Sequence, residues 1–133
     1  MVSGIFGSEC WRRRCLSDAM ASKDPQIYLF HIRDCCQELI TCRDLREQGG
    51  IPESILFHAV CRNLEIIGEV SQKIGAEFRE ANPGIPWREM KGLRNVLIHN
   101  YDGVDPALVW TIVERDIPLL LRVVRGLTER IEG

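Results

Sequence analysis

The segment KDPQIYLFHIRDCCQELITCRDLREQGG, residues 23–50, decides the fold. Asp24 is a favourable N-cap residue, Pro25 suits the first helical position, and Gly49–Gly50 ends the pattern. Between these signals the apolar positions recur every three or four residues, as Ile27, Phe30 (or Leu29), Ile32, Cys35, Leu39 and Cys42. A stripe of this period predicts one long amphipathic helix that buries one face.

A second helix is predicted from Pro52 to a stop at Gly75. Its expected core face consists of Ile55, Leu56, Ala59, Val60, Leu64, Ile67 and Val70. The stretch FREANPGIPW, residues 78–87, is predicted to be a connector. Asn82–Pro83–Gly84 has the composition of a turn, and Pro86 can open another helix.

Two more helices follow this connector. The third is predicted over PWREMKGLRNVLIHN, residues 86–100, and buries Met90, Leu93 and Leu97. Asp105–Pro106 opens the last helix, whose expected buried positions are Val109, Ile112, Val113, Ile117, Leu120, Val124, Leu127 and Ile131. Pro118 has no amide hydrogen to donate to the Glu114 carbonyl, so a kink is expected there.

Four long helices with short links predict an all-α, up-and-down helical bundle, with or without one extra short helix. The sequence contains no strand-like alternation and no internal repeat. Residues 1–22 have no sustained period and are predicted to be a disordered or non-native extension, with Met20 as a candidate start. Residues 23–133 then form a single helical domain.

The composition narrows the function classes. With a net charge of −2, the chain is not expected to bind nucleic acid through its overall field, so any such role needs a local patch. A cationic run provides one, formed by Lys73, Arg79, Arg88, Lys91 and Arg94. No window is apolar enough to span a bilayer, and no secretory signal is supported. The six cysteines are therefore interpreted as reduced thiols of a cytoplasmic protein.

The segment RNVLIHNYDGVD, residues 94–105, collects polar side chains at a predicted helix end. Arg94 and Tyr101 lie about 20° apart around a helix, whereas Arg94 and His99 lie about 140° apart. Arg offers a permanent charge and a fork that matches phosphate, and His can transfer a proton near neutral pH. Together they suit metal-free phosphodiester cleavage. From the residue types alone, the favoured explanation is simpler: polar residues collect at helix ends, and His99 caps the last carbonyls.

The spacing of Arg94, His99 and Tyr101, with four residues and then one between them, resembles the signature of HEPN-domain ribonucleases. More specifically it resembles the HepT-like toxins of toxin–antitoxin pairs, and the similarity extends over about residues 23–131. It includes RNLEIIGE (62–69), NPGIPWREMKGLRN (82–95) and YDGVDPALVWTIVERDIPLLL (101–121). The resemblance implies an HEPN-like homodimer with endoribonuclease activity that needs no metal or other cofactor.

By this resemblance Arg94 and His99 are catalytic, Asn95 is a polar supporter, and the substrate is RNA. Tyr101 matches the tyrosine to which a partner nucleotidyltransferase antitoxin adds AMP. Glu65 and Glu69 share a helix face and are candidates to orient Arg94 or His99, although a solvated face is an equally good explanation. The alternative function is a catalytically silent helical module that docks a nucleotidyltransferase or a nucleotide.

Overall fold

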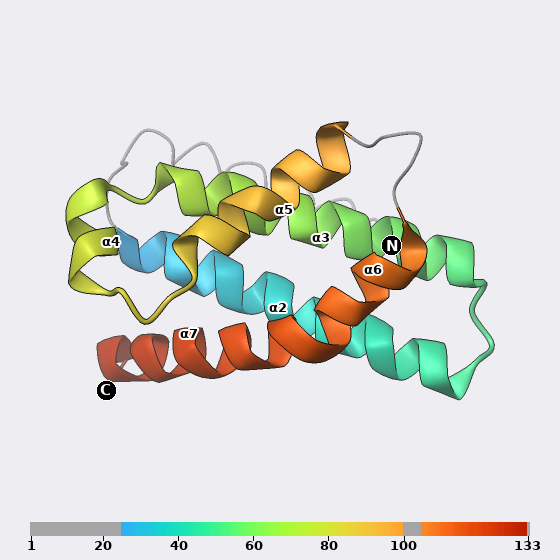
Figure 1. The fold of residues 1–133 in the computed structure, drawn as a ribbon. Coiled ribbons are helices and arrows are strands. Elements are labelled where there is room, and N and C mark those ends of the chain that lie inside the picture. The colour runs from blue at the N-terminus through green and yellow to red at the C-terminus, as the bar shows by residue number, and fades with distance from the viewer. Residues whose placement is uncertain (1–24, 100–104, 133) are drawn as a thin grey trace, which may run out of the picture.

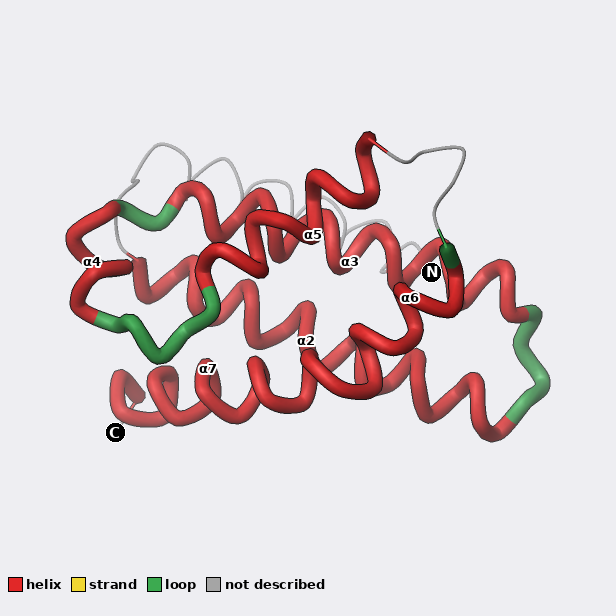
Figure 2. The backbone as a smooth tube through the Cα atoms, in the orientation of Figure 1, coloured by secondary structure: helices red, strands yellow, loops and turns green. Residues whose placement is uncertain are grey.

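The computed structural model describes residues 25–99 and 105–132, and the regular structure within these residues is entirely helical (Figure 1). Figure 2 shows how short the loops between the described helices are. The elements are α2 (Pro25–Gln48), α3 (Glu53–Lys73), α4 (Ala76–Ala81), α5 (Trp87–His99), α6 (Pro106–Thr111), the π-helical segment η1 (Ile112–Asp116) and α7 (Ile117–Glu132). The predicted all-α class is confirmed, whereas the predicted extension 1–22 lies outside the described residues.

The helices α2 and α3 form an antiparallel pair at the centre of the bundle (Figure 1). α5 packs on α3, while η1 and α7 pack on α2, so the elements follow the spatial order α5, α3, α2, α7. The four predicted long helices are present, with α6, η1 and α7 together forming the last and α4 as the extra short helix. The largest fully buried side chains come from every long helix and include Leu29, Ile32, Leu39, Leu64, Ile67, Met90 and Ile117.

The first described helix follows its sequence signals closely. α2 begins at Pro25 and ends at Gln48, and Gly49 and Gly50 then adopt positive φ angles of 78° and 94°. Such angles are easy only for glycine, which explains why the pattern stops there. Of the two candidates for one stripe position, Leu29 is fully buried, whereas Phe30 is half-buried with the Arg33 guanidinium 4.8 Å above its ring.

Two details of the predicted second helix and connector are wrong. Ile55 was expected in the core but is 57% exposed, because Leu56, one residue and about 100° further around the helix, takes the inward position. The connector prediction is wrong for Phe78–Ala81, which belong to α4. Phe78 packs partly against the core and holds this short helix in place, an interaction that local turn composition cannot show.

The irregularity expected near Pro118 is present as a π-helical turn. The amide of Ile117 donates to the carbonyl of Ile112, five residues earlier, instead of four. The wider turn accommodates the proline, which cannot donate a hydrogen bond and collides with the preceding turn of a regular α-helix. α6 and α7 consequently run in different directions in Figure 1. The predicted cap of α6 is confirmed, because the Asp105 carboxylate accepts from the Ala107 amide at 3.0 Å.

Arg46 joins three elements at one end of the bundle. Its Nε lies 3.4 Å from a carboxylate oxygen of Glu53 on α3, and its Nη1 lies 3.5 Å from one of Glu114 on η1. Its guanidinium carbon also lies 4.4 Å from the ring centre of Trp110 on α6. This arrangement fixes the π-helical turn against the α2–α3 pair. In the part of the chain that is described, no helix is both long and apolar enough to cross a membrane.

Candidate active site

The helix that carries the motif begins at a well-formed turn. The amide of Ile85 donates to the carbonyl of Asn82, as predicted for the Asn82–Pro83–Gly84 turn, and α5 then starts at Trp87. Met90 and Leu97 are buried, and Leu93 packs partly against the core. Because these apolar side chains fix the rotation of α5, they also determine where Arg94 lies.

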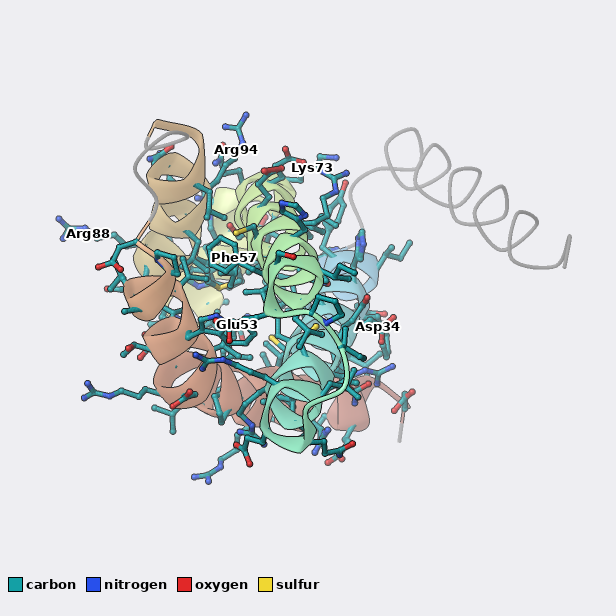
Figure 3. The ribbon with its side chains drawn as sticks, turned by 90° about the vertical axis from the view of Figure 1, so that its right-hand side faces the viewer. Asp34, Glu53, Phe57, Lys73, Arg88 and Arg94 are labelled. Carbon is teal, nitrogen blue, oxygen red and sulfur yellow. The ribbon has the colours of Figure 1, made fainter. Side chains whose placement is uncertain are left out.

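Arg94 lies at a close contact between α5 and α3, next to Gly68 of α3. Of the glycines in the described residues, only Gly68 has no room for a Cβ atom. A Cβ atom at Gly68 of α3 would lie 2.7 Å from the Arg94 Cβ and 3.0 Å from its backbone nitrogen. Distances this short are not tolerated between carbon atoms, so only glycine allows this crossing. Figure 3 shows Arg94 on the side of α5 nearer α3, whereas Arg88 of the same helix extends away from the bundle. Gly68 therefore positions the candidate catalytic arginine.

Among the described residues, the guanidinium of Arg94 has one anionic neighbour. Its Nε lies 3.6 Å from a carboxylate oxygen of Glu69, and the two side chains are 38% and 43% exposed. At this exposure an ion pair stabilises a protein by only about 0–1 kcal/mol. The same Nε is enclosed by protein and forms no hydrogen bond with the described residues. Arg94 is thus oriented by an ion pair with Glu69 that, within the described residues, leaves its Nε without a hydrogen bond.

The structure describes some of the other predicted site residues and not others. Glu65 lies 3.2 Å from Nη1 of Arg62 and not beside Arg94, so the two glutamates have separate partners. Asn95 is exposed on α5. His99 is the last residue of α5, but its side chain, like all of Tyr101, lies outside what the structure describes. The roles assigned to these residues stay predictions.

The sequence analysis missed Gly68 as a positioning residue. A glycine inside a strongly helical pattern costs about 1 kcal/mol relative to alanine, so its presence often has a packing reason. That signal was available within RNLEIIGE, although the partner at the contact was not. Asn63, in the same segment, is buried, and its amide donates to the Ala59 carbonyl at 2.8 Å. It therefore contributes to the helix and not to the site.

The buried cysteines lack the properties of nucleophiles. Burial is the largest cause that raises the pKa of Cys35 to about 12, with nearby Glu38 and Asp34 adding to it. Burial likewise raises the pKa of Cys36 to about 12. Both groups are therefore protonated thiols at neutral pH. Among the residues described, no cluster of three or more His, Cys, Asp or Glu side chains is arranged to hold a metal ion.

The family model and the relatives reported below all carry ribonuclease names. A family model described as "Ribonuclease HepT-like" matches residues 28–127. A Methanocaldococcus jannaschii protein named "Putative RNase MJ1380" is 41% identical over 106 residues, which cover 79% of this chain and 97% of that protein.

Two further relatives carry similar names. A Caldanaerobacter subterraneus protein named "Putative RNase TTE0752" is 35% identical over 109 residues, covering 81% of this chain and 97% of that protein. A Thermococcus cleftensis protein named "Probable ribonuclease HepT" is 53% identical over 62 residues, covering 47% of this chain and 56% of that protein. No solved structure gives a significant match.

Proposed function

The chain belongs to the HepT-like ribonuclease family, and on this premise we propose that it is a homodimeric, metal-independent endoribonuclease toxin. The family assignment makes it an RNA-cleaving enzyme. The observation that supports the catalytic role is how Arg94 is positioned and which hydrogen bonds its guanidinium makes. The packing at Gly68 and the ion pair with Glu69 hold Arg94 in place, while its guanidinium forms no hydrogen bond with the described residues.

The proposed reaction breaks one phosphodiester bond by internal attack. The ribose 2′-oxygen bonds to the adjacent phosphorus as its proton leaves, and the bond to the 5′-oxygen of the next nucleotide breaks. The products are a 2′,3′-cyclic phosphate and a 5′-hydroxyl, so no water is consumed. Negative charge builds up on the phosphate oxygens in the transition state, where the fixed charge of Arg94 stabilises it.

Two proton transfers accompany this step, one from the attacking hydroxyl and one to the leaving oxygen. A single imidazole cannot easily be base and acid at the same moment, whereas two copies of His99 in a homodimer supply one of each. The helix macrodipole favours the imidazolium at a helix C-terminus, which suits the acid role. His99 occupies that position as the last residue of α5. Asn95 and Glu69 are proposed to support the catalytic pair.

Tyr101 is proposed to be the off switch. A nucleotidyltransferase antitoxin would transfer AMP from ATP to the Tyr101 hydroxyl, with pyrophosphate leaving. The added phosphate would place bulk and negative charge beside Arg94, in competition with RNA. Co-expression with such a partner should add the mass of adenylate to the Tyr101 peptide, and Tyr101→Phe should abolish the addition. An unmodified peptide in both proteins would contradict this switch. The proposed compartment is the cytoplasm, where RNA and partner meet.

The activity test uses the full chain after treatment with a chelator and a set of structured and unstructured RNAs. We expect cleavage that leaves cyclic phosphate ends, and a loss of at least about 10²-fold in His99→Ala. Circular dichroism and size-exclusion chromatography should show the variant folded and assembled like the wild type. If wild type and His99→Ala are equally inert while the protein still binds a nucleotidyltransferase, the silent binding module is the correct function.

A further inference from the structure

A second cationic feature lies at the corner where α4 meets α5. There the surface contains a hollow of about 390 Å³. Its lining consists of three cations, one carboxylate, one aromatic ring and one small residue: Arg79, Arg88, Lys91, Glu80, Trp87 and Ala76. The structure therefore divides the cationic run of the sequence. Three of its five members share one hollow, and Lys73 and Arg94 are not among the residues that line it.

The cations of this hollow differ from the arginines that are held in ion pairs. Five arginines in the described residues form ion pairs, namely Arg33, Arg43, Arg46, Arg62 and Arg94. Arg79, Arg88 and Lys91 form none within that part of the chain, and the Nε of Arg79 is enclosed there without a hydrogen bond. Three positive charges and a single carboxylate, that of Glu80, line the hollow, so like charges outnumber the counterion and an anionic ligand would stabilise them.

The corner that carries the hollow is held by specific contacts. The indole N–H of Trp87 donates to the carbonyl of Asn82 at 2.9 Å, and the Asn82 side chain donates to the carbonyl of Phe78 at 3.0 Å. The rings of Phe78 and Trp87 meet edge to face, with centroids 6.4 Å apart. These contacts fix α4 against the start of α5. The cations are consequently presented from a preorganised surface, which reduces the entropy lost on binding.

Two cations of the hollow lie on the same helix as Arg94, although Arg88 and Arg94 are about 120° apart around its axis. Steps of three residues along α5 rise about 4.5 Å and rotate back by about 60°, so Arg88, Lys91 and Arg94 follow one winding line. Figure 3 shows its two ends, with Arg88 directed away from the bundle and Arg94 on the side nearer α3. Arg88 is thus about 9 Å along the axis from Arg94. A flexible polyanion bound at one end can reach the other.

We propose that this hollow binds phosphate groups of an RNA strand that flank the bond cleaved beside Arg94. This inference rests on the proposed ribonuclease function. The ligand chemistry follows from the lining, since guanidinium and ammonium groups are the usual protein contacts to phosphate oxygens. The chain is acidic overall, with a net charge of −2, so RNA must be held by a local site. Glu80 lies within the hollow and weakens this binding.

The test compares charge-matched pairs of substitutions in the full chain. The hollow variant is Arg88→Gln with Lys91→Gln, and the control is Arg122→Gln with Arg125→Gln on α7, where both side chains are exposed. Binding is measured by fluorescence anisotropy with a single-stranded 2′-O-methyl RNA of about 12 nucleotides, which cannot form the cyclic phosphate. We expect the hollow variant to bind roughly tenfold more weakly and its salt slope to fall by about 1.4. The control should bind like the wild type.

Two further measurements sharpen this test. Glu80→Gln should bind the same RNA more tightly than the wild type, because it removes the only carboxylate among the lining residues. In cleavage assays the hollow variant should raise KM more than it lowers kcat, and more for long RNA than for a dinucleotide. A residue needed only for folding would not produce this dependence on length.

The possible failures are distinguishable. Equal RNA binding by the hollow and control variants overturns this inference, whatever the cleavage assay shows. Unchanged RNA binding with weaker capture of a nucleotidyltransferase partner would also overturn it, because the hollow would then be a protein-docking site. If no RNA is cleaved, the proposed function fails, while the binding comparison still decides whether the hollow takes RNA phosphates.

Discussion

Arg46 and Arg94 are exposed to a similar extent, yet their neighbours differ. Their side chains are 34% and 38% exposed, so burial does not separate them. Arg46 has carboxylates of two elements at 3.4 and 3.5 Å and the ring of Trp110 at 4.4 Å. Arg94 has a single carboxylate at 3.6 Å and an enclosed Nε that forms no hydrogen bond with the described residues.

The difference lies in how many of the guanidinium donors are already engaged. An arginine provides five N–H donors, and a structural arginine tends to engage them within the protein. Arg46 is of this kind, since it connects α2, α3 and η1. The packing of Gly68 against Arg94 also positions this side chain, but within the described residues its guanidinium has only the ion pair with Glu69. We therefore expect substitutions at Arg46 to affect stability and substitutions at Arg94 to affect catalysis.

The largest expected effect is on RNA cleavage by Arg94→Ala. Removing one preorganised group that stabilises transition-state charge typically lowers kcat by about 10²–10³-fold. The free energy of unfolding should change by less than about 1 kcal/mol, because the lost ion pair is exposed. Cleavage rates and urea unfolding measure the two quantities. Arg94→Lys is the matched control and should recover only part of the activity, since it keeps the charge but loses the fork.

Gly68→Ala should lower both the rate of RNA cleavage and the free energy of unfolding. The new methyl group would overlap the backbone side of Arg94, and such overpacking costs about 1–3 kcal/mol of unfolding free energy. Displacement of α5 should also reduce cleavage by roughly tenfold, as a misplaced catalytic group does. The control is Gly126→Ala on α7, where a Cβ would meet nothing within 4 Å. That variant should gain up to about 1 kcal/mol, and an equal response of both variants would contradict the role of Gly68.

Arg46→Ala should destabilise the protein and leave catalysis unchanged. Loss of the contact with Trp110 and of two partly exposed ion pairs is expected to lower the free energy of unfolding by about 1–2 kcal/mol. The cleavage rate measured well below the midpoint of unfolding should equal that of the wild type. A fall in activity without loss of stability would remove the distinction between the two arginines.

The smallest expected effect is that of Glu69→Gln. Its pair with Arg94 is exposed, so the unfolding free energy should change by less than about 1 kcal/mol. Cleavage should fall a few-fold, because Glu69 orients the guanidinium without touching the substrate. Glu65→Gln is the matched control on the same helix face, since Glu65 is paired with Arg62. If Glu65→Gln reduces cleavage more than Glu69→Gln, the orienting role belongs to Glu65.

The success of the sequence analysis depended on the range of the interactions involved. The glycine stop after α2, the Asp105 cap and the disturbance before Pro118 were predicted correctly, because each is set by a few neighbouring residues. Ile55 and the helical segment Phe78–Ala81 were predicted wrongly, because their placement depends on which distant elements cover them. The position of Glu69 beside Arg94 was one of several options in the sequence, and only the packing of α5 on α3 selects it.

The sequence by itself determined that this chain is an all-α bundle and that Arg94 lies on its third long helix. Periodicity, caps and breakers act within a few residues of one another, so they can be recognised in one dimension. Only the tertiary structure decided that Gly68 lies against Arg94 and that Arg79 joins Arg88 and Lys91 in one hollow. Those contacts join residues of separate helices, and their geometry is fixed only when the buried faces of those helices pack together.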